Sequence, residues 1–298
     1  MMSGLSSIET LRTRRSGVQP SISIRVWHRI QERIRNPALR SMLSRIIATV
    51  RPSTTTQTGV EDAELMRLGL FRMPGFIDPS QAAQLREILS TFPCRDPWKP
   101  HVGTFRFDDA PAGTHVADIP AAPTLRVLHE LALDQRLLRM AAAYFGCRPY
   151  LDSVQAWWSL PGNKDPEEAE NYHRDNDSIR FLKFFLYLTD VDDMHGPHCF
   201  VTESHTVSSL LDRRRFTDSE VQACFGNERL LKITGCAGDA FMEDTFGMHK
   251  GQLPYSGRRL LVQFRYSIMP TVFRSPLTVE EVTSYNPTEV TSLLYERP

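Results

Sequence analysis

Short apolar runs separated by turn residues fill the chain from Tyr150 to Ile268 and constrain its fold more than any other feature. The runs are YLDSVQAWWSL, IRFLKFFLYLTDV, HCFVTESH, GDAFMED and RRLLVQFRYSI, and the turns between them include LPGNKDP, DDMHGP and CAGD. Runs of this length and composition, bounded by Gly, Pro, Asn and Asp, are typical of β-strands. The pattern therefore predicts a β-sandwich or jelly roll.

Helical segments are expected ahead of these strands. Asp78 followed by Pro79 is a helix-start signal, and a second helical block runs from about Thr124 to Phe145, with Gly146 as its stop. Helices followed by many short strands indicate an α+β fold with a mainly β core and flanking helices. We expect this domain to span residues 59–298.

Residues 1–58 differ in charge from the rest of the chain. Ten of the 35 Lys and Arg residues and two of the 35 acidic residues fall in 1–52, so this part carries a net charge of +8 and the remainder −8. Apolar positions recur at helical spacing from Ile22 to Val50, and Pro37 should divide them into two helices. The segment predicts a basic helical extension, followed by a linker at 53–59. It could contact a membrane or a partner, but packing on its own domain or on a second subunit is favoured.

Five scattered cysteines and the absence of a long apolar run indicate the compartment. Without a CxxC pair, an odd number of cysteines argues against a disulfide framework and for a reducing environment. No run reaches the roughly 20 residues that cross a bilayer. We expect a cytoplasmic protein, with an organelle presequence in the Arg-rich N-terminus as the alternative.

The stretch NYHRDND places His173 and Asp175 two positions apart, just ahead of a strand-like run. In a strand both side chains would point to the same face. His249, in EDTFGMHKGQ, offers a third ligand. Two imidazoles and one carboxylate form the facial triad of non-haem Fe(II) oxygenases, which leaves positions open for a co-substrate and O₂. Asp177 would point to the same strand face and is the alternative carboxylate, but it lies farther from His173 than Asp175 does.

An oxygenase of this type needs an electron source, which 2-oxoglutarate supplies, and an Arg fork is the best partner for its distal carboxylate. In SGRRLLVQFRY, strand alternation places Arg259 on one face with Leu261, Gln263 and Arg265, and Arg258 on the other face. A salt bridge to the protein's own acid would also explain a buried Arg. Together with the triad, we favour Arg259 as a ligand for the co-substrate, with Arg258 as the alternative.

These motifs resemble the phytanoyl-CoA dioxygenase family of Fe(II)/2-oxoglutarate-dependent oxygenases. The segments that carry the resemblance are HRD, KFFLYLTDV, GPHCFVTESH, GDAFMEDTFGMHKG and GRRLL, with GLFRMPGFIDPSQAAQLREIL as the opening. It covers roughly residues 65–270 and implies a double-stranded β-helix (jelly roll) with His173, Asp175 and His249 as iron ligands. One departure is Glu203 in TESH, where the family usually has Gly.

The resemblance also implies positions that contact the co-substrate. Arg259 would anchor the distal carboxylate of 2-oxoglutarate, and Lys183, Tyr187 and Gln155 would add weaker contacts. Lys183 could instead pair with an acid, and Tyr187 could belong to the core. Because the carboxylate ligand Asp175 is present, hydroxylation or another C–H oxidation is expected rather than halogenation.

The predicted function is therefore oxidation of a small organic molecule with O₂, releasing succinate and CO₂. The alternative is a non-catalytic metal-binding jelly roll that docks to partners through its basic arm. No basic stripe interleaved with aromatic residues indicates nucleic acid, and the oligomeric state stays open. Residues 101–115 and the loop around 193–198 are the candidates for choosing the substrate. His195, His198 and His205 are expected at the cavity mouth or in solvent, not as ligands.

Overall fold

The computed structural model describes residues 21–52 and 59–272. The helices are α1 (Ile22–Gln31), α2 (Pro37–Thr49), α3 (Val60–Leu68), α4 (Pro79–Ser90), α5 (Arg126–Ala132), α6 (Gln135–Phe145) and α7 (Asp218–Phe225). The strands are β1 (Leu70–Met73), β2 (Cys94–Arg95), β3 (Thr104–Phe105), β4 (Val116–Asp118), β5 (Tyr150–Ser159), β6 (Phe181–Tyr187), β7 (His198–Val201), β8 (Leu230–Ile233), β9 (Ala240–Glu243), β10 (His249–Gly251) and β11 (Arg259–Ser267).

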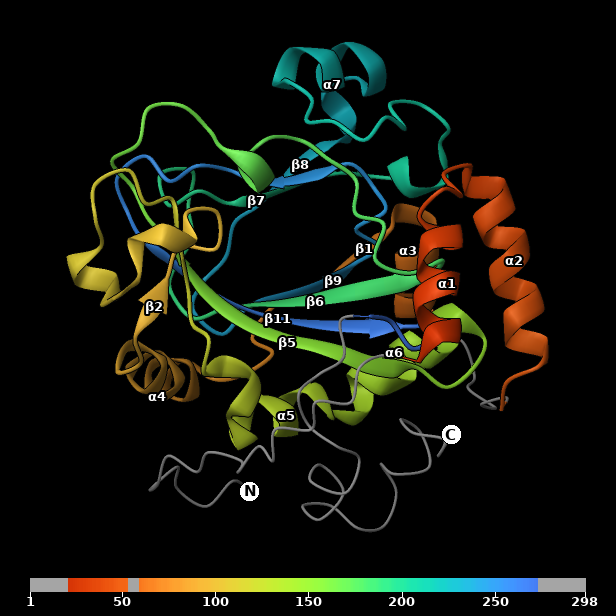
Figure 1. Cartoon of the computed structure of the whole chain (residues 1–298), viewed down its shortest axis with the longest axis horizontal. Helices are drawn as coiled ribbons and strands as arrows, with labels where there is room; N and C mark the ends of the chain where they lie inside the picture. Colours follow the sequence, from red (N-terminus) through yellow and green to blue (C-terminus); the bar gives the residue numbers. More distant parts are fainter. Residues whose placement is uncertain (1–20, 53–58, 273–298) are drawn as a thin grey trace.

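Two antiparallel sheets form the centre of the molecule. The large sheet has the order β1-β9-β6-β11-β5-β4-β2-β3, and the small sheet has the order β10-β7-β8. The small sheet lies across from the large one, and α4, α5 and α6 lie along the outer side of the large sheet (Figure 1). This mixed arrangement agrees with the predicted α+β fold and is consistent with a jelly roll.

Strand alternation divides the core of the large sheet into two layers. On β6, Leu182 and Phe184 belong to the cluster beneath the helices, whereas Phe185 and Tyr187 belong to the cluster between the sheets. Side chains on successive strand residues point to opposite faces, so both faces of β6 are buried and its sequence is apolar apart from Lys183. The inner face is the one that can carry a site.

The expected helix signals lie where the chain turns into helices. Asp78 accepts hydrogen bonds from the backbone N–H groups of Ser80 and Gln81 at the start of α4. The block predicted from 124 to 145 is two helices, because Asp134 caps α6 two residues after α5 ends. Gly146 ends α6 with φ of 72°, a left-handed conformation that favours glycine.

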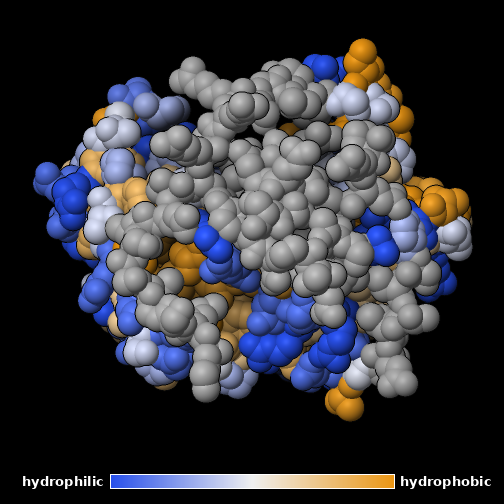
Figure 2. Space-filling model, turned by 90° about the horizontal axis from the view of Figure 1, so that it is seen from below, coloured by the Kyte–Doolittle hydropathy of each residue, from blue (hydrophilic) through white to orange (hydrophobic). Residues whose placement is uncertain are grey.

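The N-terminal helices contact the body of the protein. Pro37 is the first residue of α2 and does separate it from α1. Gln31 Nε2 donates to the Asp177 carbonyl over 2.9 Å, and Asn176 Nδ2 donates to the Glu32 carbonyl over 2.8 Å. Of the predicted linker 53–59, all but Gly59 lies outside the described residues. In the view from below, both hydrophilic and hydrophobic residues are visible at the surface (Figure 2).

None of the helices within residues 21–52 and 59–272 combines the length and the apolar character needed to cross a membrane. All five cysteines lie in the described ranges and are free thiols, three of them buried.

Candidate metal centre

His173, Asp175 and His249 meet at one point on the inner side of the fold. One potential ligand atom from each lies within 4.8 Å of the others. The His173 N–H donates to the His249 carbonyl over 2.9 Å, and the His249 N–H returns a bond of 3.0 Å. The Asp175 N–H donates to the Thr245 carbonyl over 2.9 Å. The two sequence-distant ligand segments are thus fixed by backbone hydrogen bonds.

The expected strand around His173 and Asp175 is shorter than predicted. His173 forms an isolated bridge with His249, and residues 174–180 lie outside any strand. The alternation of side chains along a strand is therefore not what brings His173 and Asp175 together. Pairing with His249 and the hydrogen bond to Thr245 bring the two side chains together instead.

Both histidines present the Nε2 atom to the centre. His173 Nδ1 lies 2.9 Å from the Asn171 carbonyl and His249 Nδ1 lies 3.0 Å from the Gly247 carbonyl, so each Nδ1 carries the proton as a donor. His173 Nε2 and His249 Nε2 lie 3.6 and 3.3 Å from Asp175 carboxylate oxygens. A backbone acceptor on one ring nitrogen is the usual device that fixes a metal-binding tautomer.

The local electrostatics favour the protonation states that a metal requires at His173 and Asp175, whereas, despite burial, the Asp175 carboxylate raises the pKa of His249, whose proton a metal ion would replace. Burial lowers the pKa of His173 to about 3, so its imidazole is neutral. Although burial opposes ionisation of Asp175, the Lys183 ammonium keeps the pKa of this carboxyl well below its usual range. Metal ligands bind as neutral imidazole and ionised carboxylate. This group of residues therefore fits a divalent metal ion of the facial-triad type.

Lys183 belongs to a buried row of alternating charges beside the triad. Its Nζ lies 2.5 Å from Asp175 Oδ2 and 3.1 Å from Asp177 Oδ2. Arg265 Nη1 lies 2.8 Å from the same Asp177 oxygen, and Arg265 Nε donates to Asp152 over 2.5 Å. Asp177 is thus held by two cations, and Asp175 is the carboxylate grouped with the two histidines. Lys183 pairs with acids, as its alternative interpretation expects, and it also lines the cavity.

A cavity of about 350 Å³ opens from the triad between the two sheets. Arg259, Leu261 and Gln263 line it from β11, as strand alternation predicts, and Gln155 lines it from β5. Gln263 Nε2 donates to Gln155 Oε1 over 2.8 Å. One cavity is therefore lined by the triad and by Gln155, Lys183 and Arg259.

Arg259 and Arg258 have opposite surroundings. The Arg259 side chain is buried, donates to Ser159 Oγ over 2.9 Å and to the Gly196 carbonyl, and forms no ion pair with an acid within the described ranges. Burial lowers the pKa of Arg259. Arg258 is exposed, with its guanidinium 5.5 Å from the centre of the Phe107 ring. Only Arg259 faces the triad cavity.

Tyr187 lies behind the cavity wall and does not line it. Its hydroxyl donates to the Ile233 carbonyl over 2.7 Å and accepts the His198 N–H over 3.1 Å. This placement matches the core interpretation of Tyr187, while a contact with a co-substrate stays a prediction.

A buried His–Glu pair next to the triad was missed by the sequence interpretation. His198 Nε2 lies 2.8 Å from Glu243 Oε1, and the His198 ring stacks near His249 with 5.6 Å between ring centres. Burial raises the pKa of Glu243 to about 8. His198 lines the cavity but is buried, and so the expected position at the mouth or in solvent is wrong for it. The sequence feature that could have indicated this pair is Glu243, an acid at the end of the apolar strand in GDAFMED.

The other two histidines also differ from each other. His195 is part of the turn and lies 2.6 Å from Asp192. His205 is buried away from this cavity, where its Nε2 lies 3.2 Å from the Met66 carbonyl. Glu203, the departure from the family pattern, has φ of 63°, so the chain keeps the left-handed conformation that glycine would adopt easily.

The mouth of the cavity is built by residues that flank the predicted substrate loop. Arg95 and Trp98 precede it, Asp118 follows it, and Trp157 and Glu170 complete this side. None of the residues from 101 to 115 lines the cavity, although His115 Nδ1 lies 2.7 Å from Oε2 of the lining residue Glu170, and their part in choosing the substrate stays a prediction. The pair Trp157 and Trp158 does split as expected: Trp158 is core and stacks on Phe107.

Comparison with known proteins supports the fold. No family model and no curated protein matches the chain. HygX from Streptomyces hygroscopicus, solved with nickel, 2-oxoglutarate and hygromycin B bound, has a TM-score of 0.51 and 19% identity over 74% of this chain and 90% of that one. The α-ketoglutarate-dependent epimerase SnoN from nogalamycin biosynthesis has a TM-score of 0.50 and 19% identity, covering 69% and 81%. EctD from S. alaskensis with bound Fe has a TM-score of 0.50 and 17% identity, covering 75% and 88%. At these identities the chain is shown to share the fold of these proteins.

Proposed function

We propose that this protein is an Fe(II)- and 2-oxoglutarate-dependent dioxygenase of the phytanoyl-CoA dioxygenase type, which hydroxylates or otherwise oxidises a C–H bond of a small organic molecule. The observation that carries the proposal is the convergence of His173, Asp175 and His249 on a cavity that the buried Arg259 also lines. Similar solved structures hold iron or nickel and 2-oxoglutarate, which supports the same pair of cofactors here.

The bound metal and co-substrate would supply the oxidising power. Together they would reduce O₂, with one of its oxygen atoms entering succinate as 2-oxoglutarate loses CO₂ and the other entering the substrate at a C–H bond. The chain would hold the metal through the two Nε2 atoms and the ionised Asp175. It would receive the distal carboxylate on the Arg259 guanidinium, whose Nε is buried without a hydrogen-bond partner.

Lys183 and Gln155 would complete the co-substrate side of the cavity. Both line it, and the Lys183 ammonium is directed at the ligand Asp175. An ammonium next to the metal-binding carboxylate favours its ionised form. We assign these two residues to orienting the co-substrate and fixing the charge of the centre.

The mouth of the cavity suggests what the substrate carries. Trp98 and Trp157 offer aromatic faces, and Glu170 Oε1 is a buried acceptor without a partner among the described residues, whereas Asp118 is paired with Arg95. Such a mouth fits a molecule that combines an apolar face with hydrogen-bond donors.

The first test is anaerobic absorption of the purified protein with Fe(II), before and after 2-oxoglutarate. We expect a visible charge-transfer band from chelation of the co-substrate. Arg259→Met should raise the 2-oxoglutarate concentration needed for half of this band by about tenfold or more, because a charge-assisted contact contributes about 1.5–3 kcal/mol. Arg258→Met is the matched control and should leave the concentration unchanged. A folded protein that binds metal and shows no band would refute the proposal.

A further inference from the structure

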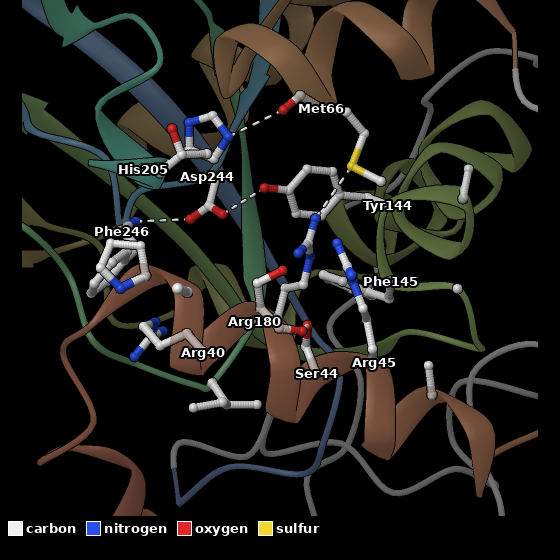
Figure 3. A pocket seen from close by; sticks show the side chains of 18 residues that line it. Arg40, Ser44, Arg45, Met66, Tyr144, Phe145, Arg180, His205, Asp244 and Phe246 are labelled. Atoms are coloured by element: carbon white, nitrogen blue, oxygen red, sulfur yellow. Dashed lines mark hydrogen bonds between the residues drawn. The ribbon is translucent and has the colours of Figure 1, made fainter. Parts of the chain in front are cut away.

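A second cavity, of about 540 Å³, lies behind the metal centre. It is walled by α2, by the ends of α3 and α6, by the residues before β6 and by the segment after β9 (Figure 3). It shares no lining residue with the cavity of the metal centre. The proposed oxygenase reaction gives it no role.

The charged lining of this second cavity is mostly positive. Arg40, Arg45 and Arg180 line it together with a single acid, Asp244, which gives a net charge of +2. Both Asp244 oxygens are occupied: Oδ2 accepts from the Tyr144 hydroxyl over 2.6 Å and Oδ1 accepts from the Phe246 N–H over 3.0 Å. The acid is therefore already committed to hydrogen bonds within the wall.

None of the three guanidinium groups forms an ion pair with an acid among the described residues, but the Arg40 guanidinium is satisfied by neutral acceptors. Arg40 is buried and donates to Asn176 and to the Ser178 carbonyl. Arg180, in contrast, donates only to Met66 Sδ, over 3.2 Å, and stacks 4.0 Å above the Tyr144 ring. Within the described part of the chain, neither Arg180 nor Arg45 forms an ion pair.

The position of these groups matters as much as their charge. Figure 3 shows the side chains of Arg45 and Arg180 directed into the cavity. Arg180 Nε is buried with no hydrogen-bond partner. A thioether is a weak acceptor, and a buried donor without a partner costs about 1–3 kcal/mol. A ligand oxyanion would satisfy the donors that the protein leaves unpaired.

The uncharged part of the wall combines polar residues (Ser41, Ser44, Tyr144, His205 and Thr206) with an apolar area. The apolar area includes Ala38, Ala48, Met66, Ala143, Phe145 and Phe246. We propose that this cavity binds an oxyanion attached to an apolar group, with the anion between Arg45 and Arg180 and the apolar group against this area. Phosphate and carboxylate share the chemistry that a pair of guanidinium groups recognises.

Calorimetric titration of the full chain tests this site with octyl phosphate, octanoate, octanol and inorganic phosphate. We expect saturable binding of one octyl anion per chain. The octyl anion that binds more tightly identifies the headgroup as phosphate or carboxylate. Octanol and inorganic phosphate should each bind at least about tenfold more weakly, because each lacks one half of the recognised chemistry.

Variants locate the binding. Arg180→Met keeps a long side chain over Tyr144, and Arg45→Glu changes an exposed position. Both substitutions should weaken the binding of the octyl anion by about tenfold or more. Arg29→Glu makes the same charge change at an exposed position of α1 and should leave affinity within about twofold. Equal binding of octanol, unchanged binding in both cavity variants, or no binding of either octyl anion would overturn the proposal.

Discussion

Arg40 links the N-terminal helices to the segment that carries the metal ligand Asp175. The side chain is 4% exposed. Its Nη1 donates to the Ile34 carbonyl over 3.0 Å and to Asn176 Oδ1 over 2.5 Å, and its Nη2 donates to the Ser178 carbonyl over 2.5 Å. Two of its three acceptors therefore lie within three residues of Asp175. Arg40→Met removes these donors and keeps the length of the side chain.

The expected loss follows from these contacts. A hydrogen bond from a charged donor contributes about 1.5–3 kcal/mol, and three are removed. Burying the guanidinium offsets part of this gain, since burial lowers the pKa of Arg40 to about 10. The methionine also keeps the packing against the Phe246 ring, which lies 4.0 Å from the guanidinium carbon. We expect a net loss of about 3 kcal/mol in the free energy of unfolding, or about 6–12 °C in Tm.

Arg40→Met should also lower the affinity for the metal by about tenfold. Residues that orient metal ligands without binding the metal themselves typically change the affinity by this factor or more. Mn(II) titration followed by electron paramagnetic resonance measures it, and thermal unfolding measures the stability. Arg33→Met is the control, since Arg33 is an exposed residue between the same two helices. Unchanged Mn(II) affinity and unchanged Tm in Arg40→Met would show that the helices merely rest on the metal-bearing segment.

Three further predictions concern pH, the metal and a turn. Burial lowers the pKa of His129 from 6.5 to about 4, so its stabilising effect is complete above pH 6.5 and is lost as the pH falls toward 4. His129→Gln should therefore remove up to about 3 kcal/mol of the acid-induced loss of stability, measured by urea unfolding at pH 7 and pH 4, and an unchanged loss would contradict this. His249→Ala should abolish Mn(II) binding while circular dichroism stays that of the folded protein; retained binding would reject the triad. Gly196 has φ of 68°, and an added Cβ would lie 2.3 Å from the Gln252 carbonyl, so Gly196→Ala should lower Tm by several degrees and raise the 2-oxoglutarate requirement through Arg259. An unchanged Tm would contradict the crowding.

The strand pattern predicted much of the site because alternation is a local property. It separated Arg259 from Arg258 and Trp157 from Trp158 without any knowledge of which strands pair. The convergence on His249 was predicted from residue chemistry, yet the backbone bonds that achieve it join segments about seventy residues apart.

Features that depend on pairing across strands were not predictable in this way. Arg265 and Asp152 meet only because β11 pairs with β5, and Glu243 meets His198 only because the two sheets face each other. The mouth of the cavity has the same origin, since Arg95 reaches it through the pairing of β2 with β4. No periodicity within one segment encodes such contacts.

The contact between α1 and the metal-bearing segment also has a consequence during synthesis. Gln31 and its acceptor at Asp177 are 146 positions apart, so at about 5–20 residues per second the first helices leave the ribosome roughly 7–30 s before the segment that they bind. Apolar side chains such as Trp27 and Ile47, which later pack on the core, are without their final partners during that interval. The excess of arginine over acids in residues 1–52 keeps this early part of the chain strongly charged, and like charge on neighbouring nascent chains opposes their association.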